Sequence, residues 1–323
     1  MKKVLITGGA GYIGAQTAHL LTRRGYDPVI VDNLSKGHRH NVDAKRLHVM
    51  DIAETDALAG LMTSEGVQAV VHFAGFIAVG ESTQRPELYF ANNVGGTISL
   101  LTAMQCAGVS RLVFSSTAAV YGMPERIPIT EDMPFAPVSP YGESKVIVEK
   151  MLGWLDQCRG LRSVALRYFN ACGADPETGL GEEHDPETHL IPLLLRAVRS
   201  GDPITLYGDD YPTPDGTCLR DYIHVADLAE AHVLALESLI AGGPSAAYNV
   251  GTGEGHSVLE VLRAVEDVTG QKVPFSMGPR RAGDAPVLVA DAARLGRSLG
   301  WKPRFTDLRD IVATAWEFEL RRA

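Results

Sequence analysis

The sequence has few cysteines and shows no cluster of metal ligands. Cys106, Cys158, Cys172 and Cys218 are the only cysteines among 323 residues, and they form no Cys-x-x-Cys pair. A chain of this length can bury a sufficient core without disulfides, so we expect reduced thiols and a cytoplasmic protein. The ten histidines show no metal-binding pattern, and the sequence predicts no metal.

Long apolar runs and excess positive charge are also missing. The N-terminal residues lead at once into a glycine-rich loop, without the long apolar region of a secretion signal. The most apolar window, 67–80, is interrupted by His72 and is too short to cross a bilayer. The formal net charge of -9 disfavours nucleic acid and anionic membranes as partners. With 45% hydrophobic and 21% charged residues, the composition is that of an ordinary globular protein, and an anionic small molecule stays open as its partner.

A glycine-rich loop follows the first predicted strand, residues 3–7, and precedes a helical pattern. Gly8, Gly11 and Gly14 have the spacing Gly-x-x-Gly-x-x-Gly. Gly8 and Gly11 would allow a tight turn close to a pyrophosphate, and Gly14 would let the helix pack on the strand. A plain flexible turn is the alternative.

A carboxylate ends the second predicted strand, residues 28–31. Asp32 lies 18 residues beyond Gly14, a separation that suits hydrogen bonds to the adenosine ribose. Its charge would repel a 2′-phosphate, so the sequence predicts NAD rather than NADP. The alternative is a helix cap or a turn residue.

Further strands, predicted at 47–49, 67–73, 111–114 and 161–168, alternate with helical patterns such as 93–107. This alternation predicts an α/β fold with a doubly wound parallel (Rossmann) sheet, whose ligands lie at the carboxyl ends of the strands. We expect an NAD-binding domain over residues 1–170, completed by strand and helix returns from the second half. A smaller C-terminal α/β substrate-binding domain would occupy mainly residues 171–323.

The catalytic candidates lie after the fifth predicted strand. Thr117 ends a Ser-Ser-Thr run, and Tyr141 and Lys145 are four residues apart at the start of a predicted helix. Positions i and i+4 share a helix face, so the ammonium would favour the ionised phenol. Tyr141 could then act as a base although a free tyrosine has a pKa of roughly 10. The alternatives are an unrelated surface pair and, for Thr117, a turn residue.

Together, the glycine spacing, Asp32, the Ser-Ser-Thr strand end and Tyr-x-x-x-Lys resemble the extended short-chain dehydrogenase/reductase superfamily over the whole chain. The resemblance implies that Tyr141 is the catalytic acid/base. It implies that Lys145 holds the nicotinamide ribose and lowers the tyrosine pKa, and that Thr117 assists the proton transfer.

The second half adds candidate anion ligands. A turn-rich string over residues 207–225 includes Arg220, and Arg281 and Asp284 lie close together further on. The guanidinium fork suits diphosphate oxygens. For any single residue, surface ion pairing is the alternative.

Combined with Arg-Tyr-Phe-Asn at 167–170 and His-Phe-Ala-Gly at 72–75, these motifs resemble the UDP-glucose 4-epimerases. The resemblance implies reversible C4 epimerisation of UDP-glucose and UDP-galactose through a transient 4-keto sugar, with tightly bound NAD. It also implies a homodimer formed by helices near 93–107 and 141–156. The implied NAD ligands are Gly8, Gly11, Tyr12, Ile13, Gly14, Asp32, Asn33, Asp51, Ile52, Phe73, Ala74, Gly75, Asn92, Lys145 and Phe169. The implied UDP-sugar ligands are Thr117, Asn170, Leu190, Tyr207, Arg220, Arg281 and Asp284.

Three positions depart from that family's pattern. Ile77 stands where many members have a lysine near the cofactor, and His189 replaces a frequent asparagine beside the substrate. Leu288 occupies the place of a bulky tyrosine in some members and of a small residue in others. Acceptance of N-acetylated or pentose UDP-sugars therefore stays open.

Two other functions compete with epimerisation. A sugar-nucleotide 4,6-dehydratase or a decarboxylase would resemble this chain but have a carboxylate just after the strand-end threonine, where Ala118 and Ala119 stand. A non-catalytic NAD-sensing regulator would share the fold but usually lacks the Tyr-x-x-x-Lys pair. The alanines at 118 and 119 and the intact Tyr141–Lys145 pair both favour the epimerase.

Overall fold

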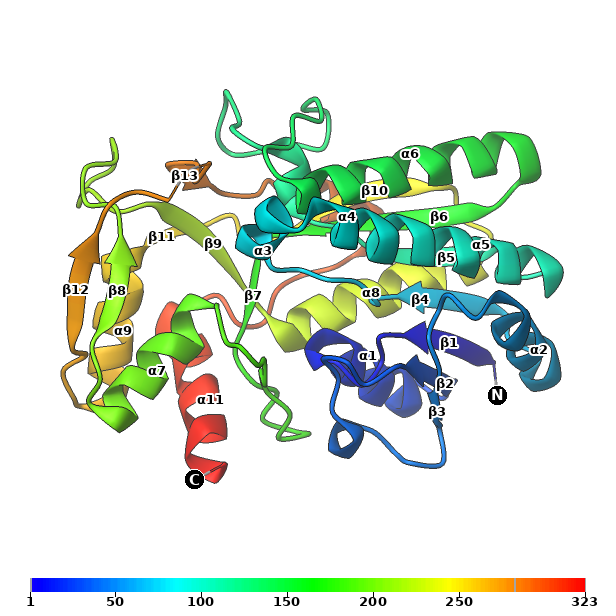
Figure 1. The fold of residues 1–323 in the computed structure, drawn as a ribbon, viewed down its shortest axis with the longest axis horizontal. Helices are drawn as coiled ribbons and strands as arrows, with labels where there is room; N and C mark the ends of the chain where they lie inside the picture. Colours follow the sequence, from blue (N-terminus) through cyan, green and yellow to red (C-terminus); the bar gives the residue numbers. More distant parts are fainter. Residues whose placement is uncertain (1, 282, 323) are drawn as a thin grey trace.

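A computed structural model describes residues 2–281 and 283–322, and its largest element is a parallel sheet of seven strands in the order β10-β6-β5-β4-β1-β2-β3 (Figure 1). The strands are β1 (Lys3–Thr7), β2 (Asp27–Asp32), β3 (Leu47–Val49), β4 (Ala69–His72), β5 (Arg111–Ser115), β6 (Arg162–Tyr168) and β10 (Ala246–Val250). All six pairings are parallel.

Helices cover both faces of this sheet, because successive strand residues point to opposite faces and both sets are apolar. One face packs against α1 (Tyr12–Arg23), α8 (Val225–Ile240) and α10 (Ala293–Leu299). The other packs against α2 (Thr55–Glu65), α5 (Gly96–Cys106) and α6 (Pro140–Arg159). The predicted doubly wound Rossmann sheet is confirmed.

A second, smaller group of strands lies beside the first sheet (Figure 1). β9 (Leu219–His224) pairs with β7 (Asn170–Cys172), β11 (Gly255–Ser257) and β13 (Val287–Leu288). β8 (Ile204–Tyr207) pairs with β12 (Phe275–Gly278). The helices α7 (Leu190–Ser200), α9 (Val258–Thr269) and α11 (Leu308–Arg321) share one buried apolar cluster with them. The chain enters this group at Asn170 and later returns to the large sheet through α8, β10 and α10; the boundary at 170/171 stays a prediction.

Short elements complete the chain. They are η1 (Arg39–Asn41), α3 (Val79–Gln84), α4 (Pro86–Tyr89) and η3 (Ala118–Tyr121). The helix expected at 93–107 begins instead as a π-helical stretch, η2 (Phe90–Gly95), which continues into α5. Among the described residues, no helix has the length and apolarity needed to cross a membrane.

Candidate active site

The start of α6 brings Tyr141 and Lys145 together. The Ser139 side chain caps the helix by accepting a hydrogen bond from Gly142 N, and Pro140 occupies its first turn. One turn apart, both side chains are buried, and Lys145 Nζ lies 5.9 Å from the centroid of the Tyr141 ring. Lys145 Nζ also donates to the carbonyl of Ser115, the last residue of β5, at 2.9 Å. The predicted pair therefore meets at the carboxyl end of a sheet strand.

Burial shifts the pKa of both groups. It raises the pKa of Tyr141, with a smaller contribution in the same direction from Tyr168, while a hydrogen bond from Thr117 acts against it. Burial lowers the pKa of Lys145 to about 8, opposed by Glu149. The expected lowering of the tyrosine pKa by Lys145 is not found, because burial of the phenol is the largest cause of the shift and the ammonium is not among its causes.

The buried ammonium makes a pH-dependent contribution to stability. Lys145 has a folded pKa of about 8, below its ordinary 10.5, so the unfolded chain binds more protons between these values. The contribution of Lys145 to stability therefore rises as pH rises through 8. Relative to Lys145→Met, the wild-type free energy of unfolding should increase by about 1 kcal/mol from pH 8 to pH 9.

Urea unfolding across this pH range measures that difference. Lys150→Met is the matched control, because Lys150 is exposed on the same helix. A difference between wild type and Lys145→Met that stays constant from pH 7 to pH 10 would contradict the expected titration.

The glycine turn forms a backbone cradle between β1 and α1. Gly8 has φ +67°, and a Cβ there would lie 2.6 Å from the Ala74 nitrogen. A Cβ on Gly14 would lie 2.3 Å from the Gly8 oxygen. Gly11 caps α1 without a side-chain hydrogen bond, so no cap side chain covers the first N–H groups of the helix. This cradle fits the pyrophosphate of a dinucleotide.

Polar groups for an adenosine ribose gather at the ends of β2 and β3. Asp32 is buried and accepts hydrogen bonds from Ala10 N at 3.0 Å and Leu34 N at 2.8 Å. Asn33 Nδ2 donates to Asp51 Oδ2 at 2.8 Å. The strand ends thus place Asp32, Asn33 and Asp51 together, as predicted, in an arrangement that fits NAD.

Asn93 is a buried residue that the sequence analysis did not identify. Its side chain donates to Phe76 O at 3.0 Å and to Ser144 Oγ at 3.1 Å, and accepts from Phe76 N. It thereby joins the loop after β4 to α6. A Cβ on Gly75 would lie 3.2 Å from Asn93 Oδ1 and 3.6 Å from Lys145 Nζ. The adjacent Asn92–Asn93 pair was the available sequence signal.

The remaining NAD candidates line the same end of the sheet. Phe73 and Ala74 follow β4, and both backbone nitrogens donate to Thr7 O. Tyr12 OH donates to Gly173 O at 2.5 Å, which joins α1 to the second half of the chain. The others are Ile13 in the first turn of α1, Ile52 after β3, Asn92 in η2 and Phe169 between β6 and β7.

Four predicted substrate residues form a second group. Arg220, the second residue of β9, donates to Ala285 O at 2.8 Å and to Asp284 Oδ1 at 3.2 Å. The Arg281 guanidinium lies 4.2 Å from the centroid of the Tyr207 ring. Among the described residues, no hydrogen bond or ion pair joins Asn170 or Leu190 to this group.

Leu288 connects this group with the sheet. It lies opposite Arg220 in the β13–β9 register and packs against a buried cluster that includes Phe169 and Val146 of α6. A Cβ on Gly283 would lie 3.8 Å from the Val138 side chain, just before α6. The loop before β13 therefore approaches the start of α6.

A buried ion pair contacts Ser116, the residue before Thr117. Arg167 Nη2 is 2.6 Å from Glu149 Oε2, and both side chains are over nine-tenths buried. Ser116 Oγ also donates to Glu149, at 2.5 Å. The Glu149 carboxylate is thus held by Ser116 and Arg167. Ala118 and Ala119, just after Thr117, have no carboxylate.

Comparison with known proteins agrees with this geometry. The model of the NAD dependent epimerase/dehydratase family matches residues 4–251, and the chain belongs to that family. A UDP-glucose 4-epimerase of Lacticaseibacillus casei is 49% identical over 319 residues, covering 98% of this chain and 96% of the relative.

Solved structures also match this chain over nearly its whole length. The UDP-glucose 4-epimerase from Brucella ovis in complex with NAD superimposes with a TM-score of 0.95 at 48% identity, covering 98% of each chain. The enzyme from Bifidobacterium longum, in complex with NAD+ and UDP, gives 0.93 at 37% identity, covering 99% of this chain and 98% of the other. These relatives place the chain among the UDP-glucose 4-epimerases of its family and confirm the resemblance.

Proposed function

We propose that this chain interconverts UDP-glucose and UDP-galactose by inverting C4 of the hexose, with NAD as a tightly bound cofactor. The observation that carries the proposal is the buried Tyr141–Lys145 pair beside Thr117, at the strand end where the dinucleotide cradle also lies. The absence of a carboxylate at Ala118 and Ala119 separates epimerisation from elimination of water.

Tyr141 accepts the proton of the 4′-hydroxyl and later returns it. Thr117 holds the phenol by the hydrogen bond that favours its ionised form. Lys145, fixed by the Ser115 carbonyl, places its ammonium beside the ring. NAD, when bound, supplies the hydride acceptor and donor at C4 together with a positive ring.

Arg220 and Arg281 hold the diphosphate of the substrate, with Asp284 and Tyr207 orienting the two guanidinium groups. The hexose is left free to turn about its bond to the diphosphate and to present its other face. Leu288 lies next to Arg220 and borders the sugar pocket. Its intermediate size leaves N-acetylated and pentose UDP-sugars as alternative substrates.

Product analysis tests the proposal. Purified protein, supplied with NAD, is incubated with UDP-galactose, and the nucleotide sugars are separated by chromatography. We expect a mixture in which UDP-glucose exceeds UDP-galactose. A dehydrated 4-keto product would identify a dehydratase, and no turnover with any UDP-sugar would favour an NAD-sensing regulator.

We also propose a homodimer formed through α5 and α6. Ile98 on α5 is 49% exposed and Trp154 on α6 is 67% exposed, although both are large apolar side chains. The helices lie side by side (Figure 1), and Arg159 of α6 donates to Gln105 of α5. The exposed thiols of Cys106 and Cys158 suit a reducing compartment, and we place the enzyme in the cytoplasm.

Trp154→Glu is expected to convert the dimer to a monomer, because it places a charge in an apolar interface. Light scattering coupled to gel filtration measures the mass. Phe275→Glu is the matched control, since Phe275 is 43% exposed on β12 and lies outside α5 and α6. A Trp154→Glu protein that remains dimeric would assign the interface to another surface.

A further inference from the structure

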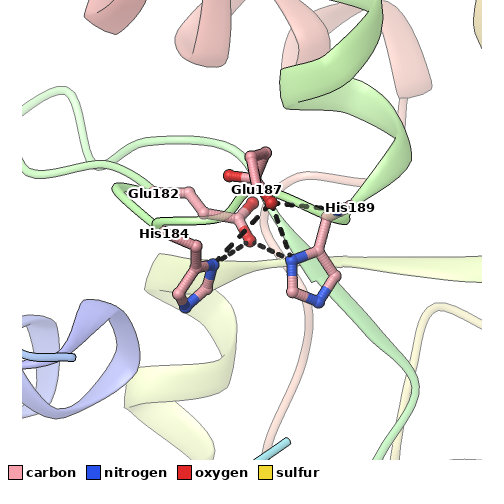
Figure 2. A group of neighbouring side chains, drawn as sticks. All are labelled: Glu182, His184, Glu187 and His189. Carbon is pink, nitrogen blue, oxygen red and sulfur yellow. Dashed lines mark hydrogen bonds and ion pairs between the residues drawn. The ribbon is translucent and has the colours of Figure 1, made fainter. Parts of the chain in front are cut away.

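Two glutamates and two histidines converge just before α7. Glu182, His184, Glu187 and His189, here called the Glu-His cluster, each offer one ligand atom, and these atoms all lie within 4.8 Å of one another. Figure 2 shows both imidazole rings directing a nitrogen towards the two carboxylates. His189 Nδ1 is 2.7 Å from Glu182 Oε1 and 3.2 Å from Glu187 Oε1. His184 Nδ1 is 2.9 Å from Glu182 Oε1 and 3.9 Å from Glu187 Oε1.

One carboxylate oxygen of the cluster has no hydrogen-bond partner, although it is not the oxygen that faces the imidazole rings. The Glu187 side chain is only 1% exposed, and its Oε2 has no hydrogen-bond partner among the described residues. Arg196 Nη2 approaches it at 3.9 Å, beyond hydrogen-bonding range. A buried carboxylate oxygen without a donor is costly, and a cation would satisfy Oε2 only if both oxygens of Glu187 bound it.

We propose that the Glu-His cluster binds a divalent transition-metal ion, with Zn²⁺ as the best match. Two imidazole nitrogens and two carboxylate oxygens are a set of four ligands that zinc accepts. Bonds of about 2.0 Å in a tetrahedron separate neighbouring ligand atoms by about 3.3 Å. The four separations given above, from 2.7 to 3.9 Å, bracket that value.

Charge balance supports the same ion. Glu182 and Glu187 place two negative charges in a site where both side chains are at most 5% exposed. A divalent cation would neutralise both in place of the His189–glutamate ion pairs present here, and it would leave the histidines uncharged, which is the form in which imidazole binds metals. Because four protein ligands close the coordination shell, the site is structural.

The position of the cluster gives the ion its role. The His184 ring packs edge-on against Tyr12 of α1, with ring centroids 6.3 Å apart. His189 is the N-cap residue of α7, immediately before Leu190. The ion would therefore fix residues 182–189 between Tyr12, which follows the glycine turn, and Leu190, a candidate substrate residue. This proposal departs from the sequence prediction of no metal, and it does not depend on the proposed epimerase activity.

Metal analysis of the full-length protein tests the proposal. The protein is produced without a polyhistidine tag, dialysed, and measured by plasma mass spectrometry. We expect about one zinc per chain, and a loss of at least about tenfold in zinc affinity for His184→Ala and for Glu187→Gln. His40→Ala is the matched control, because His40 belongs to the neighbouring group of His38, His40 and Glu183. Unchanged zinc in the two variants, or loss in His40→Ala alone, would overturn the assignment.

Cobalt substitution keeps the test valid if a variant fails to fold. Wild-type protein is stripped with a chelator and titrated with Co²⁺. We expect the visible absorption of tetrahedral Co²⁺ to saturate at about one equivalent, and the melting temperature to rise when Zn²⁺ is added instead. Failure of the UDP-galactose assay with these signals intact would refute only the epimerase proposal. Absence of both signals would leave the cluster as a set of His–Glu ion pairs and refute the metal.

Discussion

Tyr141→Phe is expected to lower kcat by about a thousandfold, which is the typical size of a general acid–base contribution. The variant removes only the phenolic oxygen, and the ring keeps its packing in a position that is 6% exposed. The proton of the 4′-hydroxyl then has no acceptor. Kinetics with UDP-galactose measure the loss.

Two controls separate catalysis from folding. UDP binding to Tyr141→Phe, measured by calorimetry, should match wild type because Arg220 and Arg281 lie in a different group of side chains. Tyr248→Phe alters another buried tyrosine, on β10, and should retain wild-type kcat. Turnover by Tyr141→Phe within tenfold of wild type would remove Tyr141 from its assigned role.

Gly8→Ala is expected to abolish NAD retention and to lower the free energy of unfolding by about 3 kcal/mol or more. Two costs combine at this position. The backbone has φ +67°, which side chains with a Cβ rarely adopt, and the new Cβ would lie 2.6 Å from the Ala74 nitrogen. The Ala74 nitrogen is a backbone atom and the new Cβ is attached directly to the backbone. Neither can therefore move without distorting the cradle.

Gly25→Ala isolates the first of these costs. Gly25 has φ +80°, but nothing lies within 4 Å of its added Cβ. We expect a loss of about 1 kcal/mol and normal NAD content. Denaturant unfolding and the absorbance of released NAD report the two quantities. Equal effects from both substitutions would show that contact with Ala74 is unimportant.

Local patterns predicted the large sheet well. The strand expected at 3–7 is β1, and the strand expected at 161–168 is β6 after a shift of one residue at its start. Each contains a central apolar run, 4–6 in β1 and 164–166 in β6, that can be recognised without its partner strands. A smaller C-terminal α/β domain was predicted, but the strands β7, β11 and β13 were not located, because β7 and β11 have three residues each and β13 has two. Such short strands are defined by distant pairing to β9 rather than by their own sequence.

The candidate site also combines residues that local sequence predicts with residues that only folding brings together. Tyr141 and Lys145 are neighbours on one helix, so their spacing alone predicted that they meet. Arg220 and Asp284 are 64 residues apart, and only folding shows that they pair. The pKa of Tyr141 was misjudged because its burial cannot be read from Tyr-x-x-x-Lys. The Glu-His cluster was missed although Glu-x-His-x-x-Glu-x-His was visible in the sequence, since burial of its carboxylates emerges only in the fold.

The proposed reaction has no net oxidation, so one retained NAD serves many turnovers. The most direct test uses protein purified without added NAD and incubated with a large excess of UDP-galactose. The account predicts many molecules of UDP-glucose per chain, with the cofactor still bound at the end. Product that forms only in proportion to added NAD, or an accumulating oxidised sugar nucleotide, would contradict it.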